Sequence, residues 1–391
     1  MILCILGRQT HISLAELDSL YPNNVEQISK EAALVEADTF DIEQLGGTQK
    51  ASIVELEIPS NDWRVVSSRI QKHYETKLKD IDYKVTIGMS VYGFDRTRPK
   101  DITQLGIKLK QTLKQGKVSV RLIPNNANEL NTAVSHHNKL GLSQNKIELL
   151  IVRSGVKTIV AESTGAQNIT AYARRDQERP ARDAFIGMLP PKLAQIMINL
   201  ALGAPDNSAK NILDPFCGTG VVLQEGVLKG HNVYGSDLNP KMIDYTIKNL
   251  NWLKDTHSNK AEGAVMDIRE GDAMKFKWEE ANELDAVVCE TYLGQPFSAT
   301  PSPSKLTEVR RNCNHIVDEF LKNIASQITP GTKLCVAVPA WRDIKTGRIT
   351  RLPLALNPDS LHGLTKHNHD PLLYYREDQV VARDILIFEK K

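Results

Sequence analysis

A chain of 391 residues with 41% hydrophobic and 25% charged side chains can form two or three domains, each with its own core. Its formal net charge is +2 at pH 7, and no apolar run approaches the roughly 20 residues that span a bilayer, so the sequence predicts a cytoplasmic protein with no membrane partner. The five cysteines are scattered and include no Cys-x-x-Cys pair, which argues against a disulfide framework and predicts no metal site.

The charge is unevenly distributed along the chain. Residues 1–59 carry 3 basic and 10 acidic side chains, whereas residues 60–183 carry 22 basic and 12 acidic ones, a net charge of +10. A basic block of this kind predicts a module that binds a polyanion. A solvated lysine-rich surface is the alternative that charge alone leaves open.

In chain order, residues 1–59 predict a small α+β unit. The apolar residues 1–6 predict a first strand. Ser13, followed three residues later by Glu16, has the pattern of a capping box and predicts a helix that begins there. Alternating polar and apolar residues over 52–58 predict a second strand.

Residues 60–170 predict a second α+β unit, and the polar residues 171–192 predict a linker. The paired prolines at 190 and 191 then begin a helix over 192–202. Within the second unit the patterns predict strands at 83–92 and 118–123, a helix at 102–113, and a hairpin formed by 147–153 and 156–162.

The final segment, 193–391, predicts an α/β domain with a doubly wound parallel sheet, because strand patterns alternate with helices. In such a sheet, ligands bind at the carboxyl ends of the strands, where the strand order reverses. The residues that follow the strands therefore form the candidate site. The strand patterns lie at 211–213, 232–236, 264–268, 284–289, 333–338 and 382–388.

The stretch 214–220, Asp-Pro-Phe-Cys-Gly-Thr-Gly, lies between an apolar strand and a helix. Gly218 and Gly220 let the backbone pass close beneath a ligand, and Asp214 places a carboxylate where an amine could be held. Asp237 ends the next strand, where a carboxylate can accept from both ribose hydroxyls. A dinucleotide site would have a third glycine to seat a pyrophosphate, so the pattern favours a cationic ligand.

The next two strand ends add further carboxylates. Asp272, beside Ala273, can accept from an adenine amino group. The fourth strand leads to Glu290 and Tyr292. Methylation of an exocyclic amine needs an acceptor for the amine proton and an aromatic face for the base. We therefore expect Glu290 to orient the amine and take its proton, and Tyr292 to stack on the base.

The stretch 214–220 resembles motif I of the S-adenosylmethionine-dependent methyltransferases that methylate exocyclic amines of nucleobases. Residues 179–194, which run from Arg-Pro-x-Arg-Asp to Leu-Pro-Pro-Lys-Leu-Ala, and the closing residues 374–385 are similar to the tRNA guanine-N2-methyltransferases. In that family a ferredoxin-like unit and an RNA-binding THUMP domain precede a Rossmann-like methyltransferase domain. The resemblance covers nearly the whole chain.

The resemblance implies S-adenosylmethionine as the cofactor, tRNA as the partner and a flipped guanosine as the target of methylation at N2. It implies a ferredoxin-like unit at 1–59, a THUMP-like domain at 60–170 and a Rossmann-like catalytic domain at 193–391. It leaves open whether a small activator subunit is needed. The implied cofactor site comprises Asp214, Phe216, Cys217, Gly218, Gly220, Asp237, Leu238, Asp272 and Ala273, with Glu290 and Tyr292 as the catalytic residues.

Two alternatives stay open. A DNA amino-methyltransferase would have a similar motif I and base pocket, although a basic N-terminal module argues against it. A non-catalytic RNA-binding protein that retained the methyltransferase fold is the other. It is favoured by Glu-Thr-Tyr-Leu at 290–293, where the family's catalytic motif is Asp/Asn-Pro-Pro-Tyr.

Overall fold

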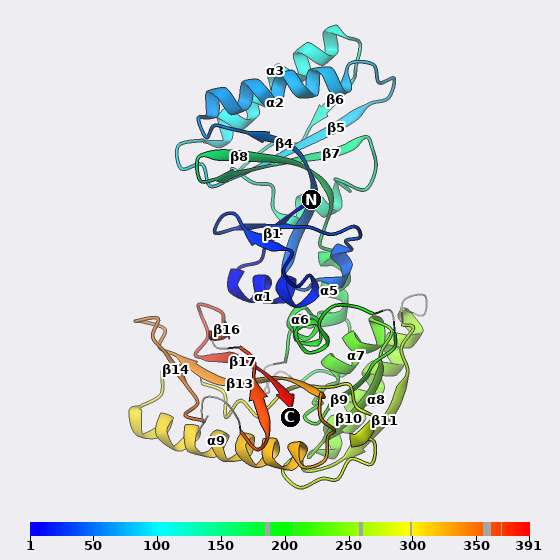
Figure 1. The fold of residues 1–391 in the computed structure, drawn as a ribbon, viewed down its shortest axis with the longest axis vertical. Coiled ribbons are helices and arrows are strands. Elements are labelled where there is room, and N and C mark those ends of the chain that lie inside the picture. Colours follow the sequence, from blue (N-terminus) through cyan, green and yellow to red (C-terminus); the bar gives the residue numbers. More distant parts are fainter. Residues whose placement is uncertain (184–187, 207, 258–260, 298, 355–360, 369) are drawn as a thin grey trace. The chain divides into compact units, whose positions relative to one another are not determined.

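The computed structural model describes residues 1–183, 188–206, 208–257, 261–297, 299–354, 361–368 and 370–391. The chain forms two compact units, Met1–Ala171 and Tyr172–Lys391, each with its own sheet (Figure 1). Helix α5 (Ile169–Gln177) carries the chain from the first unit into the second. None of the helices in the described ranges has the length and apolar character to cross a membrane.

The first unit consists of one β-sheet and several helices. Its elements are β1 (Ile2–Leu6), α1 (Thr10–Leu20), β2 (Val25–Gln27), β3 (Ala32–Val35), the short helix η1 (Ile42–Gln44), β4 (Thr48–Ile58), α2 (Trp63–Leu78), β5 (Val85–Tyr92), α3 (Pro99–Gln115), β6 (Val120–Leu122), α4 (Thr132–His137), β7 (Lys146–Ser154) and β8 (Lys157–Ala166). The strand order is β2-β3-β1-β4-β8-β7-β5-β6. The predicted α+β character of this region is confirmed.

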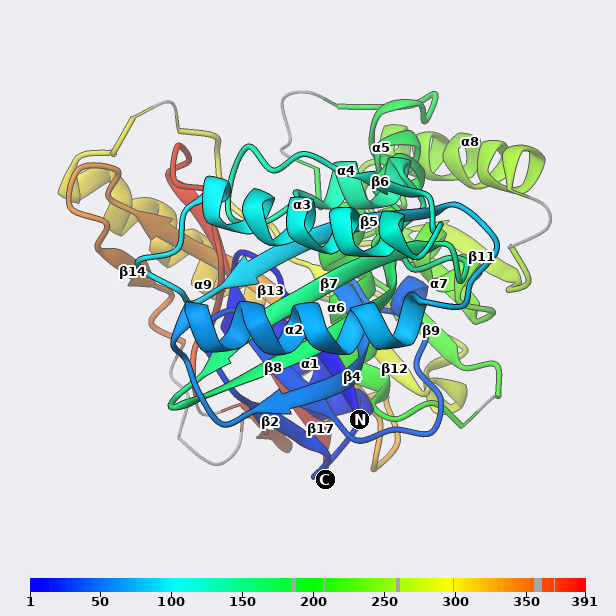
Figure 2. The ribbon, with the colours of Figure 1, turned by 90° about the horizontal axis from the view of Figure 1, so that it is seen from above.

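One sheet therefore crosses the predicted division at residue 59. Strand β4, in the predicted first part, pairs with β1 on one side and on the other with β8, which lies in the predicted second part. Helices α2 and α3 lie side by side and share a core with β5, β7 and β8 (Figure 2). The division into a ferredoxin-like and a THUMP-like part stays a prediction.

The predicted start of the first helix at Ser13 is wrong. Helix α1 begins three residues earlier, at Thr10, and both capping candidates lie inside it and are buried. The Ser13 hydroxyl donates to the carbonyl of Gly47 at 2.8 Å, and the Glu16 carboxylate accepts the N–H groups of Gly46 and Gly47 at 2.9 and 2.8 Å. These two side chains form hydrogen bonds with the backbone of the turn before β4 and do not cap the N–H groups at the start of their own helix.

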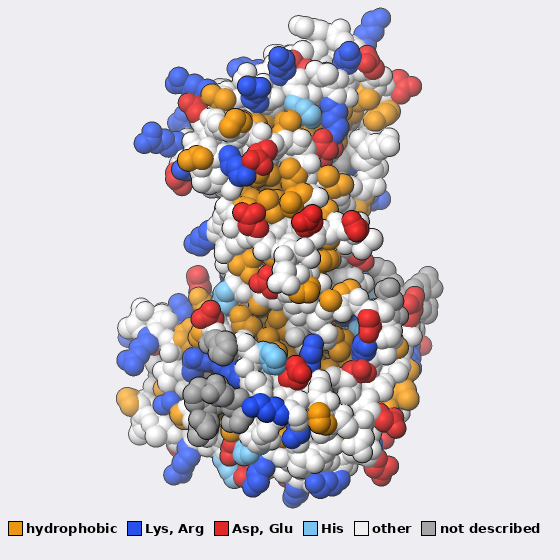
Figure 3. Space-filling view, in the orientation of Figure 1, with side chains coloured by type: hydrophobic (Ala, Val, Ile, Leu, Met, Phe, Trp, Pro, Cys, Tyr) orange, Lys and Arg blue, Asp and Glu red, His pale blue; other side chains and the backbone are white. Residues whose placement is uncertain are grey.

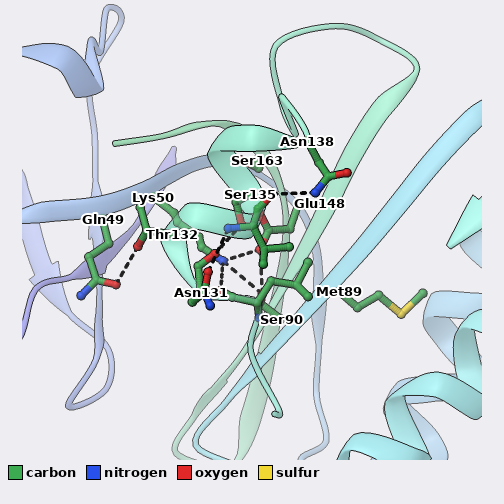
Figure 4. A network of polar contacts seen from close by, with 12 residues as sticks. Gln49, Lys50, Met89, Ser90, Asn131, Thr132, Ser135, Asn138, Glu148 and Ser163 are labelled. Carbon is green, nitrogen blue, oxygen red and sulfur yellow. Dashed lines mark hydrogen bonds and ion pairs between the residues drawn. The ribbon is translucent and has the colours of Figure 1, made fainter. Parts of the chain in front are cut away.

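A buried polar network joins β4 to β5 and β7 (Figure 4). The Lys50 ammonium pairs with Glu148 and donates to the Ser90 hydroxyl at 3.2 Å and to the carbonyl of Leu130 at 2.6 Å. Ser90 donates to the same Glu148 oxygen at 2.7 Å. Burial lowers the pKa of Lys50, and the Glu148 charge opposes that shift. Each charge in this core depends on its partner, because an unpaired buried charge is costly.

The second unit contains the α/β domain. Its elements after α5 are α6 (Pro191–Leu202), β9 (Asn211–Asp214), α7 (Val221–Leu228), β10 (Asn232–Asp237), α8 (Pro240–Thr256), β11 (Val265–Glu270), η2 (Ala281–Glu283), β12 (Ala286–Glu290), α9 (Pro303–Ala325), β13 (Lys333–Arg342), β14 (Ile349–Arg351), β15 (Leu364–Lys366), β16 (Leu372–Tyr374) and β17 (Val381–Lys390). In the described part of this unit the strand order is β11-β10-β9-β12-β13-β17-β15, with β14 beside β13 and β16 beside β17.

The strands from β9 to β13 pair in parallel, and β17 pairs antiparallel with β13. Helix α6 packs on β12 and β13, and α9 covers the other side of the sheet with the largest apolar core (Figure 1). The predicted doubly wound α/β sheet is confirmed, but it is mixed rather than parallel throughout, because the predicted strand at 382–388 runs antiparallel to β13. The buried, near-continuous apolar runs of β12 and β13 are those expected of strands covered on both faces.

Residues 171–183 of the predicted linker are structured and bound to the second unit. Arg175 forms a two-pronged ion pair with Glu225 of α7 at 2.6 and 3.1 Å. The backbone N–H and carbonyl of Ala181 both bond to the side-chain amide of Asn249 in α8, each at 2.9 Å. Polar composition predicted a linker, but these side chains attach the segment to helices α7 and α8 of the second unit.

Replacing Lys50 by Met should lower the free energy of unfolding by about 3–5 kcal/mol, because the Glu148 carboxylate is left buried without its cation. Urea denaturation of the full chain, followed by circular dichroism, measures this. The matched control is Lys157→Met in β8, which breaks the exposed Lys157–Glu57 pair on the same sheet and should leave the unfolding midpoint unchanged. Equal effects of the two substitutions would contradict a structural role for the buried network.

Candidate active site

The strand order of the second unit reverses between β9 and β12. From β9 the chain moves outward through β10 to β11, and it then returns to place β12 on the opposite side of β9. Asp214 ends β9 and Glu290 ends β12, so both acids lie at this switch point, where ligands bind in such sheets. Burial raises the pKa of Asp214 well above its usual range, and the charges of Asp237 and Glu290 add to the shift.

The glycine-rich turn after β9 is held by helix α8. Gly218 and Gly220 both have positive φ, 53° and 80°, which favours glycine at these positions. The Thr246 hydroxyl donates to the carbonyl of Gly218, and the Asn249 amide donates to that of Thr219, each at 2.9 Å. A Cβ on Gly220 would lie 3.0 Å from Thr246, so helix and turn pack directly against each other. The turn is therefore shaped by the protein itself.

Asp237 connects the ends of β9 and β10. One carboxylate oxygen accepts the N–H of Gly218 and the other accepts the N–H of Asn239, both at 2.9 Å. Each oxygen keeps a second lone pair that can accept from a hydroxyl. The next residue, Leu238, is 66% exposed, which leaves an apolar side chain at the same edge. Burial raises the pKa of Asp237, and the two N–H groups oppose that shift.

Asp272 lies in the turn after β11, and the N–H of Gly271 donates to the carbonyl of Asp237 at 2.9 Å, which joins this turn to the end of β10. One Asp272 oxygen accepts the N–H of Met274 at 3.1 Å, and the other lies 3.4 Å from the Lys275 ammonium. Asp272 thus caps its own turn, and it keeps acceptor capacity at the carboxyl edge.

Three other predicted cofactor residues lie mainly in the interior. Cys217 is buried, with its sulfur 3.7 Å from the Thr246 hydroxyl. Phe216 packs edge-on against Phe320 of α9, with ring centroids 5.0 Å apart. Ala273 is buried in the core that α9 covers. These side chains pack in the apolar cores beside the glycine turn, and their contact with a ligand stays a prediction.

The structure also brings to the site a residue that sequence reasoning missed. The Glu290 carboxylate forms an ion pair with Arg383 of β17 through Oε1 and Nε, and the two side chains are 15% and 8% exposed. The signal was present in the sequence, since Arg383 and Asp384 interrupt the apolar run between Val380 and Phe388. Burial raises the pKa of Glu290, and the Arg383 charge opposes that shift.

The residues after Glu290 extend the pairing of β12. The N–H and the hydroxyl of Thr291 both donate to the carbonyl of Ala337 in β13, at 3.0 and 3.2 Å. Tyr292 is 44% exposed, so its ring is available at the surface. The loop thus has a defined geometry at its start without the two prolines of the motif Asp/Asn-Pro-Pro-Tyr. Across the described residues, no cluster of three or more His, Cys, Asp or Glu side chains could hold a metal ion.

Comparisons with known proteins point to a methyltransferase domain. Residues 179–346 match the UPF0020 family, described as the RMKL-like methyltransferase domain. A tRNA (guanine(10)-N2)-dimethyltransferase of Methanothermobacter thermautotrophicus is 31% identical over 173 residues, 44% of this chain and 45% of that protein. A protein of the same name from Pyrococcus abyssi is 36% identical over 91 residues, 23% of each chain. This chain thus matches less than half the length of these curated relatives.

Among solved structures, TrmN from Thermus thermophilus is similar over the full length of the chain. The TM-score is 0.54 with 16% sequence identity, and the match covers 100% of this chain and 99% of that one. At this identity the likeness concerns the fold. It agrees with the α+β first unit and the α/β second unit described above.

Proposed function

We propose that this protein is an S-adenosylmethionine-dependent methyltransferase that modifies the exocyclic N2 of a guanosine in tRNA. The observation that carries the proposal is the set of acids at the carboxyl edge of the α/β sheet, Asp214, Asp237 and Glu290, around a glycine turn that the protein itself shapes. The choice of tRNA guanosine is supported by the names of the curated relatives. A tRNA substrate would place the protein in the cytoplasm.

The residues present fit the cofactor. Asp237 retains lone pairs for ribose hydroxyls, and the exposed Leu238 can cover a purine face. Among the described residues, the Phe216 carbonyl, at 3.8 Å, is the one group close to where a Cβ on Gly218 would lie, so a ligand can approach the backbone there. The Asp214 carboxylate suits an amino group and would repel a pyrophosphate. S-adenosylmethionine, when bound, supplies a methyl group on a positively charged sulfur.

Glu290 and Tyr292 supply the substrate side of the reaction. Glu290 would accept a hydrogen bond from the exocyclic amine, and it would take the proton that the nitrogen loses after gaining its bond to the methyl carbon. Tyr292 would stack on the flipped base. Alignment of the amine with the methyl group would contribute most of the rest of the rate, since no covalent enzyme intermediate is involved.

A non-catalytic RNA-binding role is the second candidate. It is favoured by the Glu290–Arg383 pair, which occupies one oxygen of the carboxylate that we assign to the amine. The proposal leads us to expect methyl transfer to unmodified tRNA by the wild type. An inactive wild type, tested alone and with cell extract as a source of a small activator subunit, would favour the second candidate.

Replacing Asp237 by Asn should weaken binding of S-adenosylmethionine about 30-fold, or roughly 2 kcal/mol, because a charge-assisted pair of hydrogen bonds to the ribose is lost. Isothermal titration calorimetry measures the affinity. Asp255→Asn, on the exposed side of the neighbouring helix α8, is the matched control and should bind as the wild type does. Unchanged affinity in the Asp237 variant would remove the cofactor assignment.

Replacing Glu290 by Gln should lower methyl transfer at least about 100-fold while cofactor affinity stays unchanged, because the missing proton acceptor acts in the transition state. Transfer of labelled methyl to unmodified tRNA, followed by nucleoside digestion to identify the position, measures this. Glu308→Gln, on the exposed side of α9, controls for the change of charge. Full activity of Glu290→Gln would refute the assignment of the proton acceptor.

The first unit is the proposed tRNA-binding module, and Lys and Arg side chains are spread over the part that holds α2 and α3 on the face drawn in Figure 3. Replacing the exposed Lys108, Lys110 and Lys114 of α3 by Gln should weaken tRNA binding and reduce the slope of log affinity against log salt by about 0.7–0.9 for each phosphate that is no longer neutralised. Filter binding at several salt concentrations measures both the affinity and the slope.

The control makes the same change at Lys254, Lys305 and Lys322 of the second unit. Equal slopes in both variants would refute the module assignment.

A further inference from the structure

The ion pair between Glu290 and Arg383 has a role beyond packing. We propose that Arg383 is a positioning residue, which holds the Glu290 carboxylate through one oxygen and leaves the other oxygen to accept from the target amine. This inference rests on the proposed methyl transfer. It adds to the site a residue of the closing strand β17 that does not itself touch the reacting atoms.

The register of the sheet explains how the two side chains meet. Glu290 lies opposite Ala337 of β13, and Arg383 lies opposite Pro339 of the same strand. Strand β13 therefore separates the two partners, which are two strand spacings apart, roughly 9–10 Å. Residues opposite each other, and residues two apart on one strand, point to the same face. The pair thus forms over Ala337, whose small side chain leaves room for it.

This geometry requires long side chains at both ends. An aspartate at the end of β12, as in the motif Asp/Asn-Pro-Pro-Tyr, is one methylene shorter than Glu290. We infer that the glutamate at position 290 depends on the presence of Arg383, because its longer side chain brings the carboxylate to the guanidinium across β13. Residues 290–293 thus differ from the motif but still hold the proton acceptor in place. The ion pair with Arg383 and the hydrogen bonds from Thr291 to Ala337 take the role that the two prolines have in the motif.

A contribution to folding stability does not by itself explain why a buried ion pair lies here. Buried ion pairs recover their desolvation penalty poorly, and apolar residues of similar volume are often at least as stabilising. The other titratable groups around Glu290 offer no second cation on the described strands beside it. They are the Asp214 carboxylate of β9 and the adjacent Cys289 thiol. Helix α6, which packs on β12, carries one charged residue, Lys192, and its ammonium lies 5.1 Å from the centre of the Tyr172 ring. Arg383 itself lies 6.0 Å from the centre of the Tyr374 ring.

The charge of Arg383 also affects the pH range in which Glu290 is ionised and can accept a proton. Glu290 accepts a proton only in its ionised form, so activity falls as pH falls through its pKa. Burial raises that pKa and Arg383 opposes the shift, so removing the guanidinium raises the pKa further. The acid limb of the rate profile should then move to higher pH.

The test compares Arg383→Gln and Arg383→Lys in two backgrounds, wild type and Glu290→Gln. In the wild-type background, Arg383→Gln should lower kcat at pH 7 at least about 10-fold, leave KM for S-adenosylmethionine within about twofold and move the acid limb upward by about one pH unit. Arg383→Lys should restore part of the loss. In the Glu290→Gln background, Arg383→Gln should change kcat less than about twofold, because Arg383 acts through the missing carboxylate.

A matched control uses the neighbouring residue of β17. Asp384 points to the opposite face of the sheet and pairs with Arg351 of β14 at 2.5 Å. Arg351→Gln therefore breaks a comparable ion pair one residue away, and its pH profile should keep the wild-type acid limb. Thermal melts of all variants show whether each is folded.

Titration of ¹³C-labelled glutamate side chains by NMR tests the pair without substrate, with the Glu290 signal assigned by its absence in Glu290→Gln. A higher apparent pKa in Arg383→Gln than in wild type is expected. An unchanged Glu290 titration, an unchanged pH–rate profile, or an equal loss of kcat in both backgrounds would overturn the positioning role while leaving the proposed function intact. A wild type that transfers no methyl group, despite a shifted Glu290 titration, would overturn the proposed function and the positioning role with it.

Discussion

The juxtaposition of two buried carboxylates, Asp214 and Glu290, at the ends of the neighbouring strands β9 and β12 is the constraint on which the site depends. Two negative charges that are close together and poorly solvated raise each other's cost of ionisation. The two carboxylates are stabilised by different partners. Asp214 accepts the N–H of Phe216 at 3.1 Å, whereas Glu290 has the guanidinium of Arg383. The antiparallel strand β17, which pairs with β13, therefore contributes to the candidate site as well as to the core.

The remaining walls of the site are organised around helix α8. Its Asn249 bonds both to the glycine turn, at the carbonyl of Thr219, and to both backbone groups of Ala181 in the segment that enters the domain. Its Thr246 holds the carbonyl of Gly218. One helix thus determines the conformation of the turn and anchors the entering segment. A ligand bound at Asp237 would meet a preformed surface, which reduces the entropy lost on binding.

The first unit contains an ion pair of the same geometry as that in the sheet of the second unit. Lys50 of β4 reaches across β8 to Glu148 of β7. Arg383 of β17 reaches across β13 to Glu290 of β12 in the same manner. In both sheets a long cation and a glutamate meet across one intervening strand. The first pair is enclosed and joins two halves of a sheet, whereas the second lies at a carboxyl edge, where one oxygen remains for another partner.

Much of this architecture follows from local sequence. The alternation of strand and helix patterns after residue 193, the glycine turn at 214–220 and the acids at successive strand ends predicted the α/β sheet and its ligand edge, because periodicity and turn chemistry act over a few residues. Contacts between distant segments were beyond that reach. The pattern of Ser13 and Glu16 is that of a helix cap, yet these side chains bond to a turn some 30 residues away. The partnership of Glu290 with Arg383 joins residues 93 positions apart and depends on β13 lying between them. The sequence by itself determined which acids stand at the strand ends, whereas the tertiary structure decided which of them has a cation, because strand order and register place charges that the chain holds far apart.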